Sequence, residues 1–359
     1  MIALAIRRAA MPMLLVLSAC NAGGDDAAQQ ARASFERQDY ITAAQQSVEA
    51  LAHAPDDAEL LQILARSYLA QGEGEGALRA AERFGAAGGD AQDAALLRSE
   101  ALLQLGRTET AMAAVSSLQS PDAWRMRAIA AMHDGDAARA DAAFTQGRRL
   151  AGDHTRLLAT QAHWLIGEGR LEEAAPVVGE LRRLAPERLE SLFVQARLAQ
   201  ERGDGAAALE SFEKILAKAP LDRPALLGAI AELGARGRIE EIRPLVVRAR
   251  KAMPGDIEFI YLDARIAAAD GNWPAVRALL QANETQVQEH PDARGLYGEA
   301  LLETGNPEQA RLQLAPLYRS HPEIPQIAKA YARALSVTGD EAQARAITRR
   351  LAQSSPPAG

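Results

Sequence analysis

The amino-acid sequence predicts an all-α protein, a solenoid of about ten stacked helix–turn–helix units. Three observations support this fold class. The composition is rich in residues that favour helices, and aromatic residues make up only 4% of the chain. A glycine followed by a polar residue recurs at a constant interval, and small apolar residues keep fixed positions around each glycine. Alternating runs of β-branched residues, which would indicate strands, are scarce.

The first twenty residues, MIALAIRRAAMPMLLVLSAC, indicate a secretory leader. Arg7 and Arg8 precede an apolar stretch that is shorter than the ~20 residues that a membrane-spanning helix requires. The stretch ends in LSAC, which resembles the lipobox of bacterial lipoproteins, and its Cys20 is the only cysteine of the chain. The resemblance implies cleavage before Cys20 and acylation of its sulfur. A plain signal peptide with a chance cysteine is the alternative.

We therefore predict a lipoprotein signal peptide over residues 1–19, a lipidated tether over residues 20–30 and the solenoid over residues 31–357. The Gly/Asp/Ala-rich composition after the cysteine is typical of a flexible segment. By resemblance to enterobacterial lipoproteins, Asn21 favours sorting to the outer membrane. The expected location is the bacterial envelope, with the protein lipid-anchored to the outer membrane and facing the periplasm.

A glycine–polar pair repeats along the rest of the chain. Gly106 follows Gly72 by 34 residues, and this interval recurs throughout, except that Gly135 follows Gly106 by 29. Glycine suits the residue just past a helix end, where the backbone turns left-handed. Gln38 is in phase with these glycines. The series comprises Gly72, Gly106, Gly135, Gly169, Gly203, Gly237, Gly271, Gly305 and Gly339.

Two further positions keep their character relative to each turn. A small or branched apolar residue lies five residues after the turn, and a second residue, small in all units but one, lies seven residues before it. Small side chains at these places would let two antiparallel helices approach closely. The first position comprises Ala43, Ala77, Ala111, Ala140, Ala174, Ala208, Ile242, Val276, Ala310 and Ala344. The second comprises Ala31, Ala65, Ser99, Ala128, Ala162, Ala196, Ile230, Ala264, Gly298 and Ala332.

A 34-residue period with these positions resembles the tetratricopeptide repeat, and the resemblance covers about residues 24–357. It implies a right-handed α/α superhelix whose concave face is lined by the first helix of each unit. The third unit is five residues short and the eighth has Pro291 three residues late, so both should have irregular helix lengths. Pro176, Pro244 and Pro316 lie deep in second helices and should kink them or shift their starts.

Composition and motifs argue against several functions. The formal net charge of −7 gives no general attraction for nucleic acid. The six histidines lack metal-ligand spacing, and the sequence contains no phosphate-binding glycine loop, HExxH, paired-cysteine motif or nucleophile elbow. We therefore predict no enzyme, no metal and no cofactor. Direct glycan or peptidoglycan binding is an alternative that needs exposed aromatic rings. Trp124 and Trp273 fall at core-facing repeat positions, which leaves Trp164.

Candidate partner-binding residues follow the second small position, and they should face the concave groove. Half of them are arginine, although the protein is acidic. These arginines could form a basic stripe that binds carboxylates by bidentate pairing. They could instead form a structural ladder, Arg66–Glu100 and Arg265–Glu299–Arg333, between neighbouring repeats. The candidates are Arg32, Arg66, Arg197, Arg265 and Arg333, with Phe193 and Tyr261 as apolar contacts for a peptide or helix.

The predicted function is therefore a non-catalytic, lipid-anchored scaffold that binds a protein or peptide partner in its groove. It would serve an envelope assembly or export system. The first two units, through Tyr40, Ala43, Leu51 and Pro55, resemble the repeat lipoproteins that accompany exosortase and exopolysaccharide gene clusters. Repeat lipoproteins of pilus biogenesis or alginate export are comparable alternatives.

Overall fold

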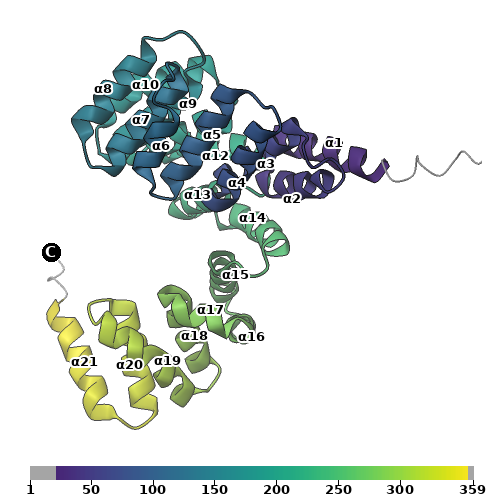
Figure 1. Ribbon diagram of the computed structural model, residues 1–359. Helices are drawn as coiled ribbons and strands as arrows, with labels where there is room; N and C mark the ends of the chain where they lie inside the picture. The colour runs from purple at the N-terminus through teal and green to yellow at the C-terminus, as the bar shows by residue number, and fades with distance from the viewer. Residues whose placement is uncertain (1–21, 355–359) are drawn as a thin grey trace, which may run out of the picture. The chain divides into compact units, whose positions relative to one another are not determined.

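The computed structural model describes residues 22–354, and its regular structure in that range is 21 helices with no strand (Figure 1). Cys20 and the predicted leader lie outside the described residues. The sequence predicted one solenoid domain, but the chain divides into two compact units between Pro220 and Leu221. At the start of unit 2, Ile230 and Ile242 occupy the two positions that usually hold small residues. The helix pair that carries them packs less closely than the last pair of unit 1.

Unit 1 contains the helices α1 (Ala22–Glu36), α2 (Tyr40–Leu51), α3 (Ala58–Gln71), α4 (Gly74–Ala86), α5 (Ala91–Gln104), α6 (Thr108–Ala114), α7 (Pro121–His133), α8 (Ala137–Arg148), α9 (Thr155–Gly167), α10 (Leu171–Leu184), α11 (Leu189–Glu201) and α12 (Gly205–Lys218). Unit 2 contains α13 (Arg223–Ala235), α14 (Ile239–Ala252), α15 (Ile257–Ala269), α16 (Trp273–Ala282), α17 (Glu284–Glu289), α18 (Pro291–Glu303), α19 (Pro307–Ser320), α20 (Pro325–Val337) and α21 (Glu341–Ser354).

The predicted turns are confirmed. Every glycine of the 34-residue series has a left-handed backbone, as does Gln38 with φ of 61°. At Gly72 the next amide, of Glu73, donates to the carbonyl of Tyr68 at 2.9 Å, and the glycine amide donates to Leu69 at 3.1 Å. This bond pair satisfies carbonyls that the helix end leaves open. Since the second helix of each unit begins two residues after the turn, the turn sets the start of that helix.

The predicted small positions lie where paired helices touch. Ala208 has no exposed surface, and Gly298 shows why bulk is excluded. A Cβ added to Gly298 would lie 2.5 Å from Cγ of Leu314 on the paired helix α19. In unit 1 the buried side chains form one apolar cluster over α1–α7 and a second over α7–α11. A repeat array built in this way buries its core by stacking neighbouring units.

The two units of irregular length are confirmed. The third unit has a second helix, α6, of only seven residues. In the eighth unit the second helix is broken into α16 and α17 at Asn283, whose side chain donates to the carbonyl of Leu279 at 2.8 Å. The prolines at 176, 244 and 316 do not shift the starts of their helices, which run through them without a break. Each proline removes a single backbone donor, which the rest of the helix tolerates.

The predicted tether is shorter than expected. The helix α1 begins at Ala22, inside the segment 20–30, and Ala27 is buried together with Ala31. These two alanines lie one helical turn apart, so they place the same face of α1 on the core. Asp25 in the first turn is favourable at the positive end of the helix dipole.

In unit 1 the first helices of successive repeats contact one another in the order α1, α3, α5, α7, α9 and α11, whereas successive second helices barely do. Because the first helices touch one another and the second helices are further apart, the stack of unit 1 curves toward its first helices. We call the surface formed by these six helices the first-helix face. It corresponds to the concave side that the repeat resemblance implied.

Candidate functional site

Arginine–carboxylate pairs connect neighbouring helices across the first-helix face. Arg32 on α1 pairs with Glu59 on α3 at 2.8 Å, and Arg66 on α3 approaches Asp93 on α5 at 3.6 Å. In both cases the acid lies 27 residues further along the chain, not 34. Helical side chains lean toward the N-terminus of their helix, so each arginine reaches an acid about two turns back on the next first helix.

The ladder predicted from the sequence is therefore wrong in its partners. Glu100 does not pair with Arg66, and Arg333 pairs with Glu303 in place of Glu299. That ladder assumed residues at equal height in adjacent repeats, whereas the pairing is staggered. The positive end of the helix dipole also favours carboxylates at the N-terminal end of the next helix. The order of charged residues in the sequence did not reveal this effect.

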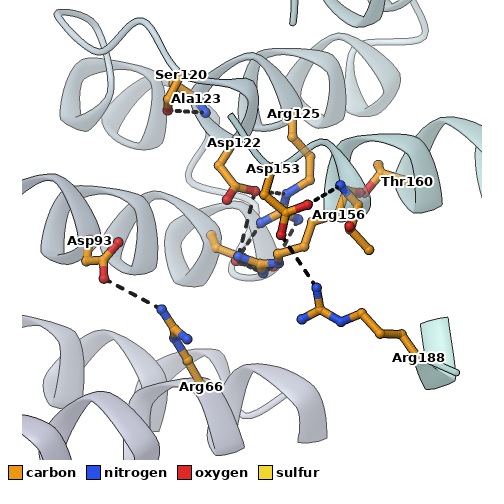
Figure 2. Close-up of polar contacts among 12 residues, drawn as sticks. Arg66, Asp93, Ser120, Asp122, Ala123, Arg125, Asp153, Arg156, Thr160 and Arg188 are labelled. Carbon is orange, nitrogen blue, oxygen red and sulfur yellow. Dashed lines mark hydrogen bonds and ion pairs between the residues drawn. The ribbon is translucent and has the colours of Figure 1, made fainter. Parts of the chain in front are cut away.

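Glu100 is the centre of a partly buried ion-pair network, of which Figure 2 labels Asp122, Arg125 and Arg156. Arg125 on α7 donates to both of its oxygens, at 3.1 and 2.8 Å, and Arg156 on α9 also contacts both, at 2.9 and 2.7 Å. Nε of Arg125 donates to Asp122 at 2.9 Å, and Asp122 lies 3.8 Å from Arg156. We call Glu100, Asp122, Arg125 and Arg156 the quartet. It joins the first helices of three consecutive repeats.

The quartet balances its own charge. Burial would raise the pKa of Glu100, but the charges of Arg125 and Arg156 outweigh it and hold the pKa at about 2. Burial would likewise lower the pKa of Arg156, and the charges of Glu100 and Asp122 raise it overall. Two cations face two anions, and Arg125 is only 6% exposed. The quartet is thus a structural element with little charge left for a ligand.

Two arginines near the quartet are compensated less completely. Arg188, the residue just before α11, lies 3.6 Å from Asp153 and 4.0 Å from Glu190, and Arg66 lies 3.6 Å from Asp93. These separations exceed the length of a charge-assisted hydrogen bond. Both guanidinium groups are nearly half exposed. Figure 2 shows Arg66 directed toward Asp93 and Arg188 directed toward Asp153.

Tyr40 shows that these charges share one region of unit 1. The residue begins α2, and its ring meets Phe35 edge to face at 5.7 Å. Burial raises the pKa of the Tyr40 phenol to about 12, and the Glu190 carboxylate raises it further against the opposing charges of Arg188, Arg156 and Arg66. Charges from the second, fifth and sixth repeats therefore act on the hydroxyl of a residue in the first. We call Tyr40, Arg66, Arg156, Arg188 and Glu190 the arginine cluster.

The predicted site residues are divided between the two units. Unit 1 contains Arg32, Arg66, Phe193 and Arg197. Phe193 is half-buried, and Arg197 pairs within its own helix with Glu201 at 3.1 Å. Tyr261, Arg265 and Arg333 belong to unit 2. The guanidinium of Arg265 lies over the Tyr261 ring, 5.8 Å from its centroid. The structure therefore gathers Arg66 into the cluster and leaves the other predicted arginines in separate contacts.

Sequence reasoning missed Arg125, Arg156, Arg188 and Tyr40. The sequence held a signal for Arg156. It lies seven residues before His163, and Asp93 lies seven residues before Glu100, at the same repeat position. That repeat position usually carries an acid, so an arginine there marks a change of charge in the middle of the face. Tyr40 lies in a turn region and has no equivalent among the predicted positions.

Aromatic residues do not form a row on the first-helix face. Trp164, whose exposure the sequence left open, is buried at 8% and stacks on Phe144 at 5.6 Å. Trp124 and Trp273 are only half-buried, so the predicted order of burial is reversed. The described residues also contain no group of three or more His, Cys, Asp or Glu side chains arranged for a metal ion. No helix within 22–354 has the length and apolar character needed to cross a membrane.

A family model described as "Tetratricopeptide repeat" matches residues 64–120, 159–223 and 298–359, about half of the chain. Among solved structures, one titled for functional characterization of Pseudomonas aeruginosa pilF is 21% identical, covers 59% of this chain and 97% of its own, and has a TM-score of 0.49. YrrB, described as a TPR protein with an unusual peptide-binding site, is 17% identical over 51% and 95%, with a TM-score of 0.43. Yeast Tom70 is 12% identical over 92% of both chains, with a TM-score of 0.39. No curated protein sequence matches this chain.

Proposed function

Because the chain belongs to the tetratricopeptide repeat family, we propose that it is a non-catalytic scaffold that binds an acidic segment of a partner protein at the arginine cluster of unit 1. Repeats of this family generally serve protein–protein interaction. The observation that carries the proposal is the incomplete pairing of Arg66 and Arg188 on the first-helix face.

The charges of the cluster favour an acidic ligand. The cluster contains three arginines and one acid, Glu190, whose Oε2 is covered and has no hydrogen-bond partner. Outside the cluster, Asp93 lies 3.6 Å from Arg66 and Asp153 lies 3.6 Å from Arg188. Arg156 is already held by the quartet, so Arg66 and Arg188 supply the available donors. A guanidinium binds a carboxylate through two parallel hydrogen bonds, which gives both attraction and orientation. An acidic segment laid along the face could receive both arginines.

Side chains beside the cluster offer apolar contact. Phe35 and Tyr40 lie against each other and are both partly exposed, and Phe193 on α11 is half-buried. Aromatic groups next to arginines are enriched at the energetic centres of protein interfaces. The preferred ligand is therefore a segment with apolar side chains among its carboxylates.

Charge reversal tests this proposal with a fluorescein-labelled hexaglutamate peptide as the probe. Arg66→Glu and Arg188→Glu should each weaken binding at least about tenfold in fluorescence polarisation, because each removes an attraction and adds a repulsion. Arg107→Glu is the matched control, since Arg107 is exposed and pairs with Glu75 at 2.7 Å away from the cluster. Equal binding by all three variants, with the helical circular dichroism unchanged, would place the acidic ligand elsewhere.

We further propose that the scaffold is held at the bacterial envelope by acylated Cys20 and faces the periplasm. The support is the LSAC sequence after an apolar leader, with Cys20 as the only cysteine. A periplasm-facing anchor would place the first-helix face among components of an envelope assembly or export system, including the exopolysaccharide systems whose lipoproteins the first two repeats resemble. Two or more acyl chains would be needed for a stable anchor, because one chain binds membranes only marginally.

A further inference from the structure

A cavity lies at the shortened third repeat. The helix α6 has only seven residues and ends at Ala114, and the cavity lies beside it, against α7 and α8. The cavity has a volume of about 720 Å³ and is lined by α6, α7 and α8, which Figure 1 labels within unit 1. Small-molecule sites commonly lie in the range of about 300–1,000 Å³. We call it the α6–α8 cavity, and it shares no residue with the arginine cluster.

Its lining combines apolar groups with four charged side chains, and of its two arginines Arg127 is the one without a carboxylate partner among the described residues. Met112, Trp124 and Ala143 provide apolar surface, and the guanidinium of Arg127 lies over the Trp124 ring, 4.5 Å from its centroid. Trp124 is the largest side chain of the lining and is only half-buried. An aromatic ring partly open to a cavity offers a flat face to an apolar ligand.

Arg127 carries a charge that no carboxylate balances. Its Nη2 donates to the carbonyls of Val115 and Leu118, both at 2.9 Å, beyond the end of α6. Its Nη1 is covered and has no hydrogen-bond partner, and no ion pair to Arg127 occurs among the described residues. Burial lowers its pKa, which reflects the cost of holding the charge there. The short helix thus fixes a guanidinium in place and leaves part of its bonding capacity unused.

The remaining charges of the lining do not neutralise Arg127. Asp134 is occupied by its ion pair with Arg139. Glu109 is an exposed acid on α6 and would weakly oppose an anion in the cavity. An uncharged apolar ligand would leave the charge of Arg127 without a counter-ion, whereas a carboxylate would supply one.

We propose that the α6–α8 cavity binds an apolar carboxylate, whose ring or branched apolar group packs on Trp124 and whose anion pairs with Arg127. A free aromatic acid and an acidic–aromatic pair of side chains in a peptide share this chemistry. The cavity is a second binding site, separate from the first-helix face.

The test compares 3-phenylpropionate with 3-phenylpropionamide on the full chain by isothermal titration calorimetry. The acid should bind about tenfold or more tightly than the neutral amide, since a charge-assisted contact is lost in the amide. Arg127→Gln should remove this preference, Arg127→Lys should keep part of it, and Glu109→Gln should strengthen binding of the acid. Equal affinity of the wild type for acid and amide would overturn the proposal.

A cavity-filling variant tests the location without touching Arg127. Ala142→Trp places a large side chain at an exposed position of the lining, and Ala138→Trp does so one turn earlier on α8, outside the cavity. The first should weaken binding at least about tenfold and the second should not change it, with both retaining the helical circular dichroism. Unaltered binding by Ala142→Trp would contradict the site.

A third arm distinguishes the source of the ligand. The peptide acetyl-Glu-Phe-Glu-amide should bind more tightly than 3-phenylpropionate if the natural ligand is a protein segment, and less tightly if it is a free acid. Either order supports an apolar carboxylate site, and binding of neither probe would refute it.

Discussion

Replacing Glu100 by glutamine should destabilise unit 1 strongly, because it leaves the buried Arg125, together with Arg156, with Asp122 as the one remaining carboxylate of the network. The pKa of Glu100 falls from its ordinary 4.5 to about 2, against a burial cost that acts in the other direction. At about 1.4 kcal/mol per pKa unit, this shift corresponds to roughly 3 kcal/mol of stabilisation by the charged form. The same magnitude follows from the loss of one partner of a buried ion pair, about 3–5 kcal/mol.

Urea unfolding followed by circular dichroism measures this loss, and hydrogen exchange locates it. Repeat units can open separately, so faster exchange should be concentrated in α5, α7 and α9, the helices that the quartet joins. Glu82→Gln is the matched control, because Glu82 is exposed and lies 4.0 Å from Arg98. A loss below about 1 kcal/mol for Glu100→Gln, or a loss equal to that of the control, would refute the role assigned to the quartet.

The pH dependence has a defined sign. A carboxyl whose pKa is lowered by folding stabilises the folded state above its unfolded pKa, and this contribution is lost as the pH falls from about 4.5 toward 2. The stability difference between the wild type and Glu100→Gln should therefore be constant near neutral pH and shrink over that acidic range. A difference that is independent of pH down to 2 would mean that Glu100 is not the titrating partner.

Three further changes test the repeat geometry and the anchor. Ala208→Leu should cost about 1–3 kcal/mol by overpacking a contact with no exposed surface, whereas the nearby exposed Glu210→Gln should leave the unfolding midpoint unchanged; similar melting of both would mean that the repeat register is wrong. Gln38→Gly should stabilise the protein by about 0.5–1 kcal/mol, because glycine adopts the φ of 61° without strain, and a lower unfolding midpoint would contradict this. Cys20→Ser should abolish incorporation of radiolabelled palmitate, and equal labelling of the variant would exclude acylation at this residue.

The repeat pattern predicted the fold well where local chemistry decides it. Some features can be read from a single residue. Gly72 is a glycine because the turn needs positive φ, and Ala208 is small because two helices approach closely there. The division between the units was not predicted, because Ile230 and Ile242 each still fit an apolar position. Their effect is to loosen the packing of a helix pair, which depends on the neighbouring helix as much as on the residue itself.

The candidate site was predicted only in part. Arg66 was singled out because arginine on an acidic chain is conspicuous, and the structure brings it to the arginine cluster. Its pairing partner was predicted at the wrong offset, since the direction in which helical side chains lean is absent from a count of repeat positions. Arg188 acts on Tyr40 although the two residues belong to the sixth and the first repeat, and a proximity across so many repeats leaves no trace in local spacing.

The most direct test of the proposed scaffold function is photo-crosslinking, in cells that produce the protein, from a benzoylphenylalanine placed at Tyr40 in the arginine cluster. The account predicts one dominant protein adduct that disappears in the Arg66→Glu, Arg188→Glu double variant and persists in the Arg107→Glu control. Its yield should also fall with added salt in isolated envelopes, because exposed charges are screened beyond about 8 Å at physiological ionic strength. An adduct of equal yield in the folded double variant would contradict recognition by these arginines.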